Sequence, residues 1–455
     1  MSVLAPAMEV ARRLQPLRMC GVVSAVKGLT VLVDELPVGV GTVVRVGGAG
    51  DVDGLGLGEV VGFTRDSAIV MMLGNTAGIR AGQTVEALQS SPVAMVGDAM
   101  LGRVIDGLCR PLDGLGAMRE LSPRAMQPDP ISPMRRRRIS QPLRVGLRAV
   151  DLMTPIGRGQ RMGVFAGPGV GKSTLLGTIA RRTSAAVNVI ALIGERGREV
   201  KDFIEHALGS EGLKRSVVVV ATGDESPLMR VRASRLACSV AEFFRDQGKD
   251  VLLMMDSVTR FAHAQRQIGL SAGEPPATKG YTPSVFAQMA LLMERAGALE
   301  VSGSGGSGGS ITGLYTILVE GDDMTEPIAD AARGILDGHV MLSRKLAQKA
   351  HFPAIDVLDS VSRVADDISP KEHMEARRQV MKTLATYRDV EDLVQIGAYA
   401  KGSNPEADAA IEYQRAINEM LRQGKDEAEA FEKAYPRFVK LAKDAADAGN
   451  RKGKK

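Results

Sequence analysis

The stretch Gly159-Gln-Arg-Met-Gly-Val-Phe-Ala-Gly-Pro-Gly-Val-Gly-Lys-Ser-Thr-Leu-Leu-Gly-Thr-Ile179 decides how this chain is built. Its first half holds a short apolar run, Met162 to Ala166, which predicts a strand, and a helix is predicted from about Lys172. The glycines between them allow the backbone to curl so that its N–H groups face one point. A strand, a glycine-rich turn and a helix in this order predict a binding site for the phosphates of a nucleoside triphosphate.

The predicted phosphate-binding loop also supplies two polar side chains. Lys172 adds a positive charge for the outer phosphates, and the hydroxyl of Ser173 is placed for Mg²⁺. We therefore expect the triphosphate and its Mg²⁺ to be bound by Ala166, Gly167, Pro168, Gly169, Val170, Gly171, Lys172, Ser173 and Thr174.

Length and composition are those of an ordinary soluble protein. The 455 residues are enough for two or three domains, and 44% are hydrophobic and 24% charged. No apolar run is long enough to span a bilayer, and residues 1–18 lack the apolar centre of a signal peptide, so we expect a cytoplasmic location. Three widely spaced cysteines predict neither a metal site nor a disulfide framework.

The net charge of +5 owes much to two short basic runs, Arg135–Arg138 and the tail 451–455. Such runs are usually solvated linkers or tails, and the alternative is contact with acidic lipid or nucleic acid. The chain has no Trp and only 4% aromatic residues, which leaves few platforms for base stacking. A nucleic-acid partner is therefore not expected.

Two different patterns precede the phosphate-binding loop. Residues 1–18 mix apolar and basic positions, which fits either an amphipathic arm that binds a partner or a frayed terminus. Residues 19–90 show short strands of period two, and a small β-barrel is predicted there. Gly21–Asp34 and Glu59–Met72 each predict two strands, with turns at Lys27-Gly28 and Arg65-Asp66.

Residues 91–370 are predicted to form an α/β nucleotide-binding core, which starts with a connecting stretch rich in Pro, Gly and Arg up to residue 150. Apolar strands then alternate with helices, which indicates a mainly parallel sheet covered on both faces. Its strands are Val187–Ile193, Val217–Ala221, Val251–Asp256 and Thr312–Val319. Residues 371–455 are predicted to be a helical domain, in which Asn404-Pro405-Glu406 begins a helix.

Two carboxylates are candidates for the chemistry. Asp256 ends an apolar strand, which suits an aspartate that holds the water shell of Mg²⁺. Glu195 closely follows another strand of the predicted sheet, and a carboxylate at that edge can accept a proton from an attacking water. The alternative for Glu195 is a surface salt-bridge cluster with its charged neighbours.

Five motifs in fixed order carry a resemblance that covers nearly the whole chain. AGPGVGKS, IGERGREV, VLLMMDSVTRF, GEPPATKGYTPSVF and HFPAIDVLDSVSRV resemble segments of the catalytic subunits of rotary ATP synthases. The stretch EGDDMTEPIADAARGILDGHVMLSR is more similar to the flagellum-specific ATPases of type III protein export, whose near relatives serve injectisomes. The resemblance implies a RecA-like core between a β-barrel and a helical domain.

The same resemblance implies a role for each matching residue. Glu195 corresponds to the catalytic glutamate that polarises water, and Arg196 to a neighbour near the γ-phosphate. Asp256 corresponds to the Mg²⁺-associated aspartate, and Arg363 to the arginine finger that enters the adjacent subunit's site in a homohexamer. Phe352 corresponds to the aromatic residue on the adenine face; the alternative is an ordinary core phenylalanine.

Three segments depart from the family pattern. Pro168 stiffens a loop position that is often small and polar, and it removes one N–H. Ser302–Ser310 is rich in glycine, which fits a mobile loop near a central pore, an artificial splice or disorder. Residues 397–408 lack the acidic tip of the rotary synthases, which favours the export branch.

We therefore expect an ATPase that works at the subunit interfaces of a homohexamer and powers protein export for the flagellum. The resemblance implies regulator and stalk proteins, chaperone–substrate complexes and the export gate as partners, and peripheral association with the inner membrane. The alternatives are an injectisome ATPase, a hexameric RNA translocase and a non-catalytic nucleotide-binding subunit. Intact Lys172 and Glu195 argue against the last of these.

Overall fold

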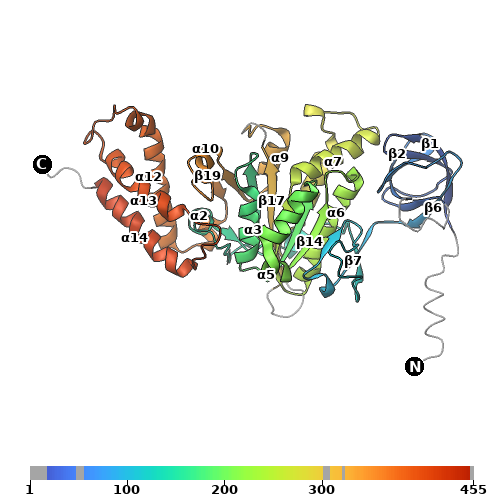
Figure 1. The fold of residues 1–455 in the computed structure, drawn as a ribbon, viewed down its shortest axis with the longest axis horizontal. Helices are drawn as coiled ribbons and strands as arrows, with labels where there is room; N and C mark the ends of the chain where they lie inside the picture. Colours follow the sequence, from blue (N-terminus) through green and yellow to red (C-terminus); the bar gives the residue numbers. More distant parts are fainter. Residues whose placement is uncertain (1–17, 48–55, 301–307, 320–322, 451–455) are drawn as a thin grey trace, which may run out of the picture.

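The computed structural model describes residues 18–47, 56–300, 308–319 and 323–450. These residues form three parts in a row along the longest axis, with a barrel at one end, a helical region at the other and a large sheet between them (Figure 1). The predicted fold class, a barrel, a mainly parallel sheet and a helical region, is confirmed. All of the arm predicted for residues 1–18 except Arg18, and most of the glycine-rich Ser302–Ser310 stretch, lie outside the described residues.

Six antiparallel strands close the barrel in the order β1-β2-β5-β4-β3-β6. Alternate valines fill its interior, among them Val31, Val44 and Val70, none of which is exposed. Both predicted hairpins form, and Gly28 takes the left-handed conformation that its turn requires, with a φ of +59°. The strands are β1 Cys20–Lys27, β2 Thr30–Asp34, β3 Val43–Val46, β4 Leu57–Phe63, β5 Ser67–Met72 and β6 Thr84–Gln89.

The central sheet has the strand order β19-β18-β12-β17-β15-β13-β14-β8, and β16 pairs with β17. All neighbours along the main path are parallel except β18 and β19. Since both faces are covered, the strands are continuous apolar runs, as in the fully buried β13. They are β8 Val104–Asp106, β12 Arg161–Ala166, β13 Val187–Ile193, β14 Ser216–Ala221, β15 Asp250–Asp256, β16 Gly297–Ala298, β17 Ser310–Leu318, β18 Gly338–Leu342 and β19 Ile355–Ser362.

Part of the stretch predicted to be a connection is built into this sheet. Val104–Asp106 forms strand β8 and pairs with β14 at the edge. Residues on either side form a separate two-stranded sheet from β7, Val93–Val96, and β9, Ser122–Ala125. A strand of three residues is too short to show periodicity, so the sequence pattern could not indicate it. Further short elements are β10 Pro142–Leu143, β11 Ile156–Gly157 and the 3-10 turns Asp98–Met100 and Pro133–Arg135.

Helices cover the two faces of the sheet with separate cores. On β13, Val189 and Ala191 pack into the core that contains residues of α6, whereas Ile190 and Leu192 pack into the core that contains residues of α3. The helices of the core are α2 Arg148–Met153, α3 Lys172–Arg182, α4 Gly197–Asp202, the π-helical turn Phe203–Leu208, α5 Gly209–Lys214, α6 Pro227–Asp246, α7 Val258–Ser271, the 3-10 turn Thr278–Gly280, α8 Pro283–Met293, α9 Pro327–Ile335, α10 Arg344–Gln348 and α11 Ala365–Ile368.

The helical region consists of α12 Lys371–Gln395, α13 Pro405–Leu421 and α14 Phe431–Asn450. The predicted start of α13 is confirmed, because Asn404 Oδ1 accepts hydrogen bonds from Glu406 N at 3.0 Å and Ala407 N at 3.3 Å. Several polar contacts join this region to the core, and two of the residues that make them, His373 and Arg148, are buried. His373 Nε2 lies 2.9 Å from Leu152 O, and the buried Arg148 bonds Glu427 and Glu429.

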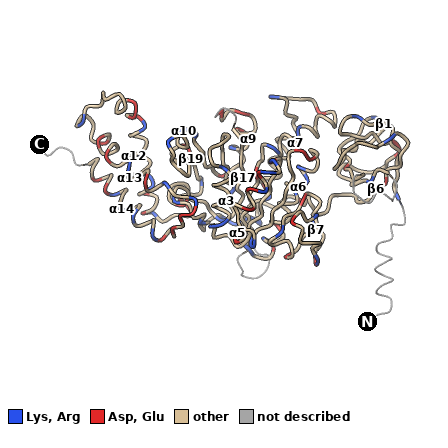
Figure 2. Tube along the Cα trace, viewed as in Figure 1, with Lys and Arg blue, Asp and Glu red and all other residues tan. Residues whose placement is uncertain are grey.

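Basic and acidic residues are interspersed along all three parts of the described chain (Figure 2). This mixture fits the small net charge of +5 and gives no extended basic stripe in the view shown. None of the helices within the described ranges is long and apolar enough to cross a membrane.

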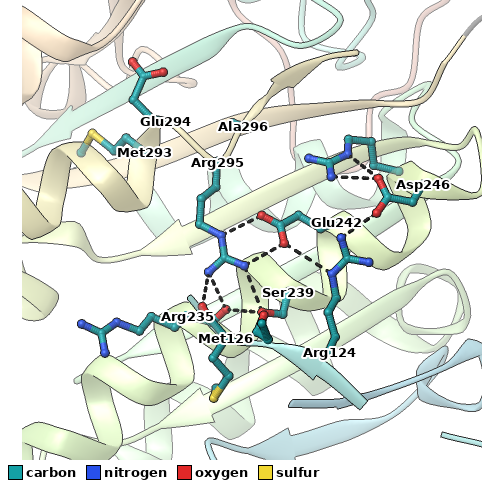
Figure 3. A network of polar contacts seen from close by, with 12 residues as sticks. Arg124, Met126, Arg235, Ser239, Glu242, Asp246, Met293, Glu294, Arg295 and Ala296 are labelled. Carbon is teal, nitrogen blue, oxygen red and sulfur yellow. Dashed lines mark hydrogen bonds and ion pairs between the residues drawn. The ribbon is translucent and has the colours of Figure 1, made fainter. Parts of the chain in front are cut away.

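A buried ionic network fastens α6 to the segments around it (Figure 3). Arg295 makes a two-pronged bond to Glu242, with Nε and Nη2 each 2.8 Å from a carboxylate oxygen. Its Nη1 donates to Met126 O at 2.8 Å, and Arg124 Nε lies 3.5 Å from the same carboxylate. Glu242 is only 2% exposed, so its charge depends on these partners.

Replacing Glu242 with alanine is expected to destabilise the protein by about 3–5 kcal/mol, because Arg295 would be left as an uncompensated buried charge. A lower urea midpoint of unfolding would show this. Glu211→Ala is the matched control, since Glu211 pairs with Lys214 on the surface and is 81% exposed, and its cost should stay below about 1 kcal/mol. Equal midpoints for Glu242→Ala and the parent chain would refute the stabilising role.

Candidate active site

The phosphate-binding loop has the geometry that its glycines predict. Strand β12 ends at Ala166, and Val319 N anchors this end by donating to Ala166 O at 3.1 Å. Gly169 and Gly171 have φ values of +77° and +93°, a region in which other residues are strained. Gly171 is also the N-terminal cap of α3, and so the first N–H groups of this helix point into the loop.

Three predicted site residues meet beside this loop. Lys172 Nζ lies 3.3 Å from Glu195 Oε1 and also bonds Asp256 Oδ1. They follow or end β12, β13 and β15, whose carboxyl ends lie at the same edge of the sheet. Exposure of the side chains is low, at 14% for Lys172, 13% for Glu195 and 4% for Asp256. The alternative of a surface salt-bridge cluster for Glu195 does not fit this burial.

The two carboxylates keep Lys172 charged. Burial would lower the pKa of this lysine, but the negative charges of Asp256 and Glu195 outweigh burial and raise the pKa above its ordinary value. The lysine is therefore a cation at neutral pH. It can exchange its carboxylate partners for phosphate oxygens without a change in its own charge.

Thr316 is a site residue that the sequence analysis missed. Its hydroxyl lies 2.8 Å from Asp256 Oδ1 and is completely buried. Thr316 reaches the aspartate because β17 and β15 are neighbours with Met255 opposite Tyr315. A threonine inside an apolar strand carries no signal of such a role, since only the pairing of strands about sixty residues apart creates it.

For the ATP hydrolysis that the sequence predicts, replacing Thr316 with valine is expected to lower kcat by about 10- to 100-fold. The reason is that a hydrogen bond to a charged group is worth about 1.5–3 kcal/mol. Since valine has nearly the same shape, folding should be retained. Because the sequence predicts that Asp256 holds the water shell of Mg²⁺, we expect the Mg²⁺ concentration for half-maximal rate to rise, whereas a purely structural role of Thr316 would leave it unchanged. Thr316→Ser keeps the hydroxyl and should restore both values; parent-like metal dependence in the valine variant would exclude the role.

The turn around Glu195 brings in a second missed residue. Gly194 has a φ of +73°, and its carbonyl accepts a hydrogen bond from Arg260 Nη1 at 3.1 Å. Arg260 lies in the first turn of α7, one turn after Asp256. The predicted Arg196 instead is highly exposed, with 86% of its side chain accessible and Glu199 at 3.5 Å.

Arg363 lies where the parallel strands β12 and β18 begin, whereas the phosphate-binding loop lies where they end. Its N–H donates to Asp337 O at 2.9 Å, and the preceding Ser362 pairs with Gly338 at the start of β18. The loop follows the end of β12, which is parallel to β18 and six residues long. At about 3.3 Å per residue, the two places are separated by roughly 15–20 Å. Within one chain, the structure does not bring Arg363 to Lys172.

A pocket of about 360 Å³ borders the phosphate-binding loop at Val170 and Gly171. Phe352, Val170 and the α3 residues Thr174 and Leu175 line it, together with Gln423 from the helical region. Phe352 is 47% exposed, so the alternative of a core phenylalanine is wrong. A mostly apolar slot next to a phosphate-binding loop has the shape and chemistry to hold a nucleotide base.

Three segments of the chain match known protein families. Residues 146–362 match the nucleotide-binding domain of the ATP synthase alpha/beta family, residues 23–89 match its beta-barrel domain, and residues 369–438 match the T3SS EscN ATPase C-terminal domain. The flagellum-specific ATP synthase of Bacillus subtilis is 51% identical over 84% of this chain and 86% of its own length. The type 3 secretion system ATPase of Xanthomonas euvesicatoria is 50% identical over 85% and 86%.

Solved structures agree with the sequences. The assembled ATPase EscN from the enteropathogenic E. coli type III secretion system superposes with a TM-score of 0.86, at 40% identity over 93% of this chain and all of that chain. EscN in complex with its central stalk EscO gives a TM-score of 0.83 over the same shares. The chain therefore belongs to the family of flagellum-specific and type 3 secretion ATPases, which lies within the ATP synthase alpha/beta family.

Proposed function

We propose that this chain hydrolyses Mg·ATP at the interfaces between subunits of a homohexameric ring and thereby powers type III protein export for the flagellum. One observation carries the proposal. Lys172, Glu195 and Asp256 meet at the carboxyl ends of the parallel strands, whereas Arg363 of the same chain lies near the amino ends of these strands. A head-to-tail ring would bring the Arg363 edge of one subunit to the Lys172 edge of the next.

ATP would be held by two adjoining features. Its phosphates fit the N–H groups of the loop and the charge of Lys172, and its base fits the slot beside Phe352. The chain also offers suitable oxygen ligands for Mg²⁺. The Ser173 hydroxyl lies on the exposed first turn of α3, and both described contacts of the Asp256 side chain fall on Oδ1, which leaves Oδ2 for a metal-bound water. The bound ion would neutralise charge on the outer phosphates.

Glu195 would act on the attacking water. The water oxygen bonds to the γ-phosphorus, the bond from that phosphorus to the bridging oxygen of ADP breaks, and the proton of the water passes to the carboxylate. Lys172 and the neighbour's Arg363 would stabilise charge on the phosphoryl oxygens, and Arg196 is exposed where it could turn towards them. Gly194 and Arg260 would hold the turn that carries the base.

The ring and its partners are inferred from relatives. EscN has been solved as an assembled ATPase and with its central stalk EscO. For this chain we propose a homohexamer that meets a stalk protein, an export regulator, chaperone–substrate complexes and the export gate. The ring would lie in the cytoplasm, peripherally associated with the export apparatus of the inner membrane.

An injectisome ATPase is the second candidate, because the Xanthomonas secretion ATPase is as similar as the Bacillus flagellar protein, at 50% and 51% identity. The RNA translocase has no such support. Deleting the gene tests the assignment: loss of flagella and motility supports the flagellar function, and loss of effector secretion with intact motility supports the injectisome. ATPase activity that rises with a stalk protein and not with single-stranded RNA supports export in both cases.

A further inference from the structure

A second pocket of about 200 Å³ lies between the edge strand β19 and the helices α12 and α13. We call it the β19–α13 pocket. Its size is below the roughly 300–1,000 Å³ of pockets for drug-sized ligands, so it suits a small molecule or ion. It is separate from the slot beside the phosphate-binding loop and shares no lining residue with that slot.

The acidic side chains that line this pocket already have cationic partners. Both oxygens of Asp356 accept hydrogen bonds from Arg388 Nη2 at 2.8 Å. Glu391 Oε1 accepts one from Lys349 Nζ at 2.9 Å. These four charges compensate one another in pairs, and so the pocket has little acceptor capacity left for a cation.

The donors of the pocket are in the opposite situation. Within the described residues, no hydrogen bond or ion pair is made by five lining side chains that can donate: His351, Tyr387, Gln414, Asn418 and Arg422. His351 lines the pocket and is only 4% exposed. Arg422 is exposed and Tyr387, Gln414 and Asn418 are half-buried, so water reaches these four, whereas the buried His351 has only the pocket to supply a partner. A buried donor that lines a small cavity favours a ligand with acceptor atoms.

The electrostatics favour an anion. Burial, and after it the positive charge of Arg422, holds the pKa of His351 below its ordinary value. The imidazole is therefore neutral at pH 7, with one N–H to donate. The guanidinium of Arg422 is exposed and makes no ion pair within the described residues, so its charge is available to an anion. We propose that the β19–α13 pocket binds a small phosphate-type oxyanion through Arg422, His351 and Tyr387.

The position of the pocket links it to the nucleotide slot. His351 lines the β19–α13 pocket, and the next residue, Phe352, lines the slot. Likewise, Arg422 lines the β19–α13 pocket, and the next residue, Gln423, lines the slot. The two segments are joined, because Gln423 N donates to Phe352 O at 2.9 Å. An anion bound to His351 and Arg422 is thus one residue from both walls of the slot. We therefore expect a bound anion to change the affinity of the slot for a nucleotide. This coupling rests on the proposed function, whereas the binding of the anion does not.

Equilibrium dialysis of the full chain against radioactive inorganic phosphate tests the proposal. A non-hydrolysable ATP analogue at saturation keeps phosphate away from the phosphate-binding loop. We expect saturable binding that Arg422→Gln weakens at least tenfold, since one charge-assisted hydrogen bond is lost. Tyr387→Phe should weaken it less. Arg415→Gln is the control, because Arg415 lies on α13, which ends just before Arg422, pairs with Glu419 at 3.0 Å and does not line the pocket.

The phosphate group could belong to a free ion or to a lipid headgroup. Flotation with phosphatidylcholine vesicles that contain phosphatidic acid distinguishes these two sources. Binding that depends on Arg422 supports the proposal for either probe, and the probe that binds identifies a free ion or a lipid headgroup. If neither probe binds saturably, or if Arg422→Gln binds like the parent chain, the proposal is wrong. Loss of anion binding with unchanged affinity for the ATP analogue would refute the coupling alone.

Discussion

Glu195→Gln is expected to lower ATP turnover by about 10²- to 10⁴-fold while the variant still binds ATP, because the amide cannot accept a proton from the attacking water. The change keeps the size of the side chain and its acceptor oxygen near Lys172, which lies 3.3 Å from Oε1. Turnover is measured by release of phosphate, and binding by dialysis against a non-hydrolysable ATP analogue. Turnover and binding should therefore separate in this variant.

A matched control comes from the neighbouring turn. Glu205 is 52% exposed and lies 3.7 Å from Lys201 on the surface, so Glu205→Gln should change the rate by no more than a factor of about two. If Glu195→Gln hydrolyses ATP at the parent rate, Glu195 is not the base. Loss of binding together with turnover would show that the change disrupts the site as a whole.

The second large effect is expected at Arg363. Arg363→Ala should lose about 10³-fold or more in turnover, because an arginine finger contributes this much in related phosphoryl transfers. Mixing this variant with Glu195→Gln should restore activity. Each Arg363→Ala chain retains Glu195, and a Glu195→Gln neighbour supplies the missing guanidinium across the interface.

The decisive control is a chain that carries both substitutions. Mixed with Arg363→Ala, it offers no intact finger, so activity should not return. Recovery in that mixture would point to ring assembly rather than to Arg363. No recovery in the first mixture, in rings shown to contain both chains, would contradict the interfacial site.

The sequence could predict those site residues whose signal is local. Lys172 follows a glycine-rich turn, and Asp256 and Glu195 follow apolar strands, so the edge at which they meet could be inferred from strand order alone. Thr316 could not be found in this way, since its contact with Asp256 depends on the register between β15 and β17. The family resemblance proposed Arg363 as an arginine finger, and only the structure shows how far Arg363 lies from the loop within one chain.

The fold shows the same difference between features with a local sequence pattern and features that depend on distant segments. Hairpins, the cap at Asn404 and the long buried strands have strong local patterns, and all of them are present. The β19–α13 pocket has no sequence signature, because its lining comes from α10 and the turn after it, from β19, α12 and α13, and from Arg422 just after α13. Burial of His351 and the pairing of Asp356 with Arg388 are properties of packing between distant segments.

Strand β8 has a consequence for how this protein can be cut into pieces. Val104–Asp106 covers the outer side of β14 with backbone hydrogen bonds, although it precedes the residues that match the nucleotide-binding family. A fragment that begins at residue 146 would leave β14 with a free row of N–H and C=O groups, which invites pairing with other chains. Fragments meant to be soluble should therefore start before residue 93, where β7 begins, and so retain the whole border of the sheet.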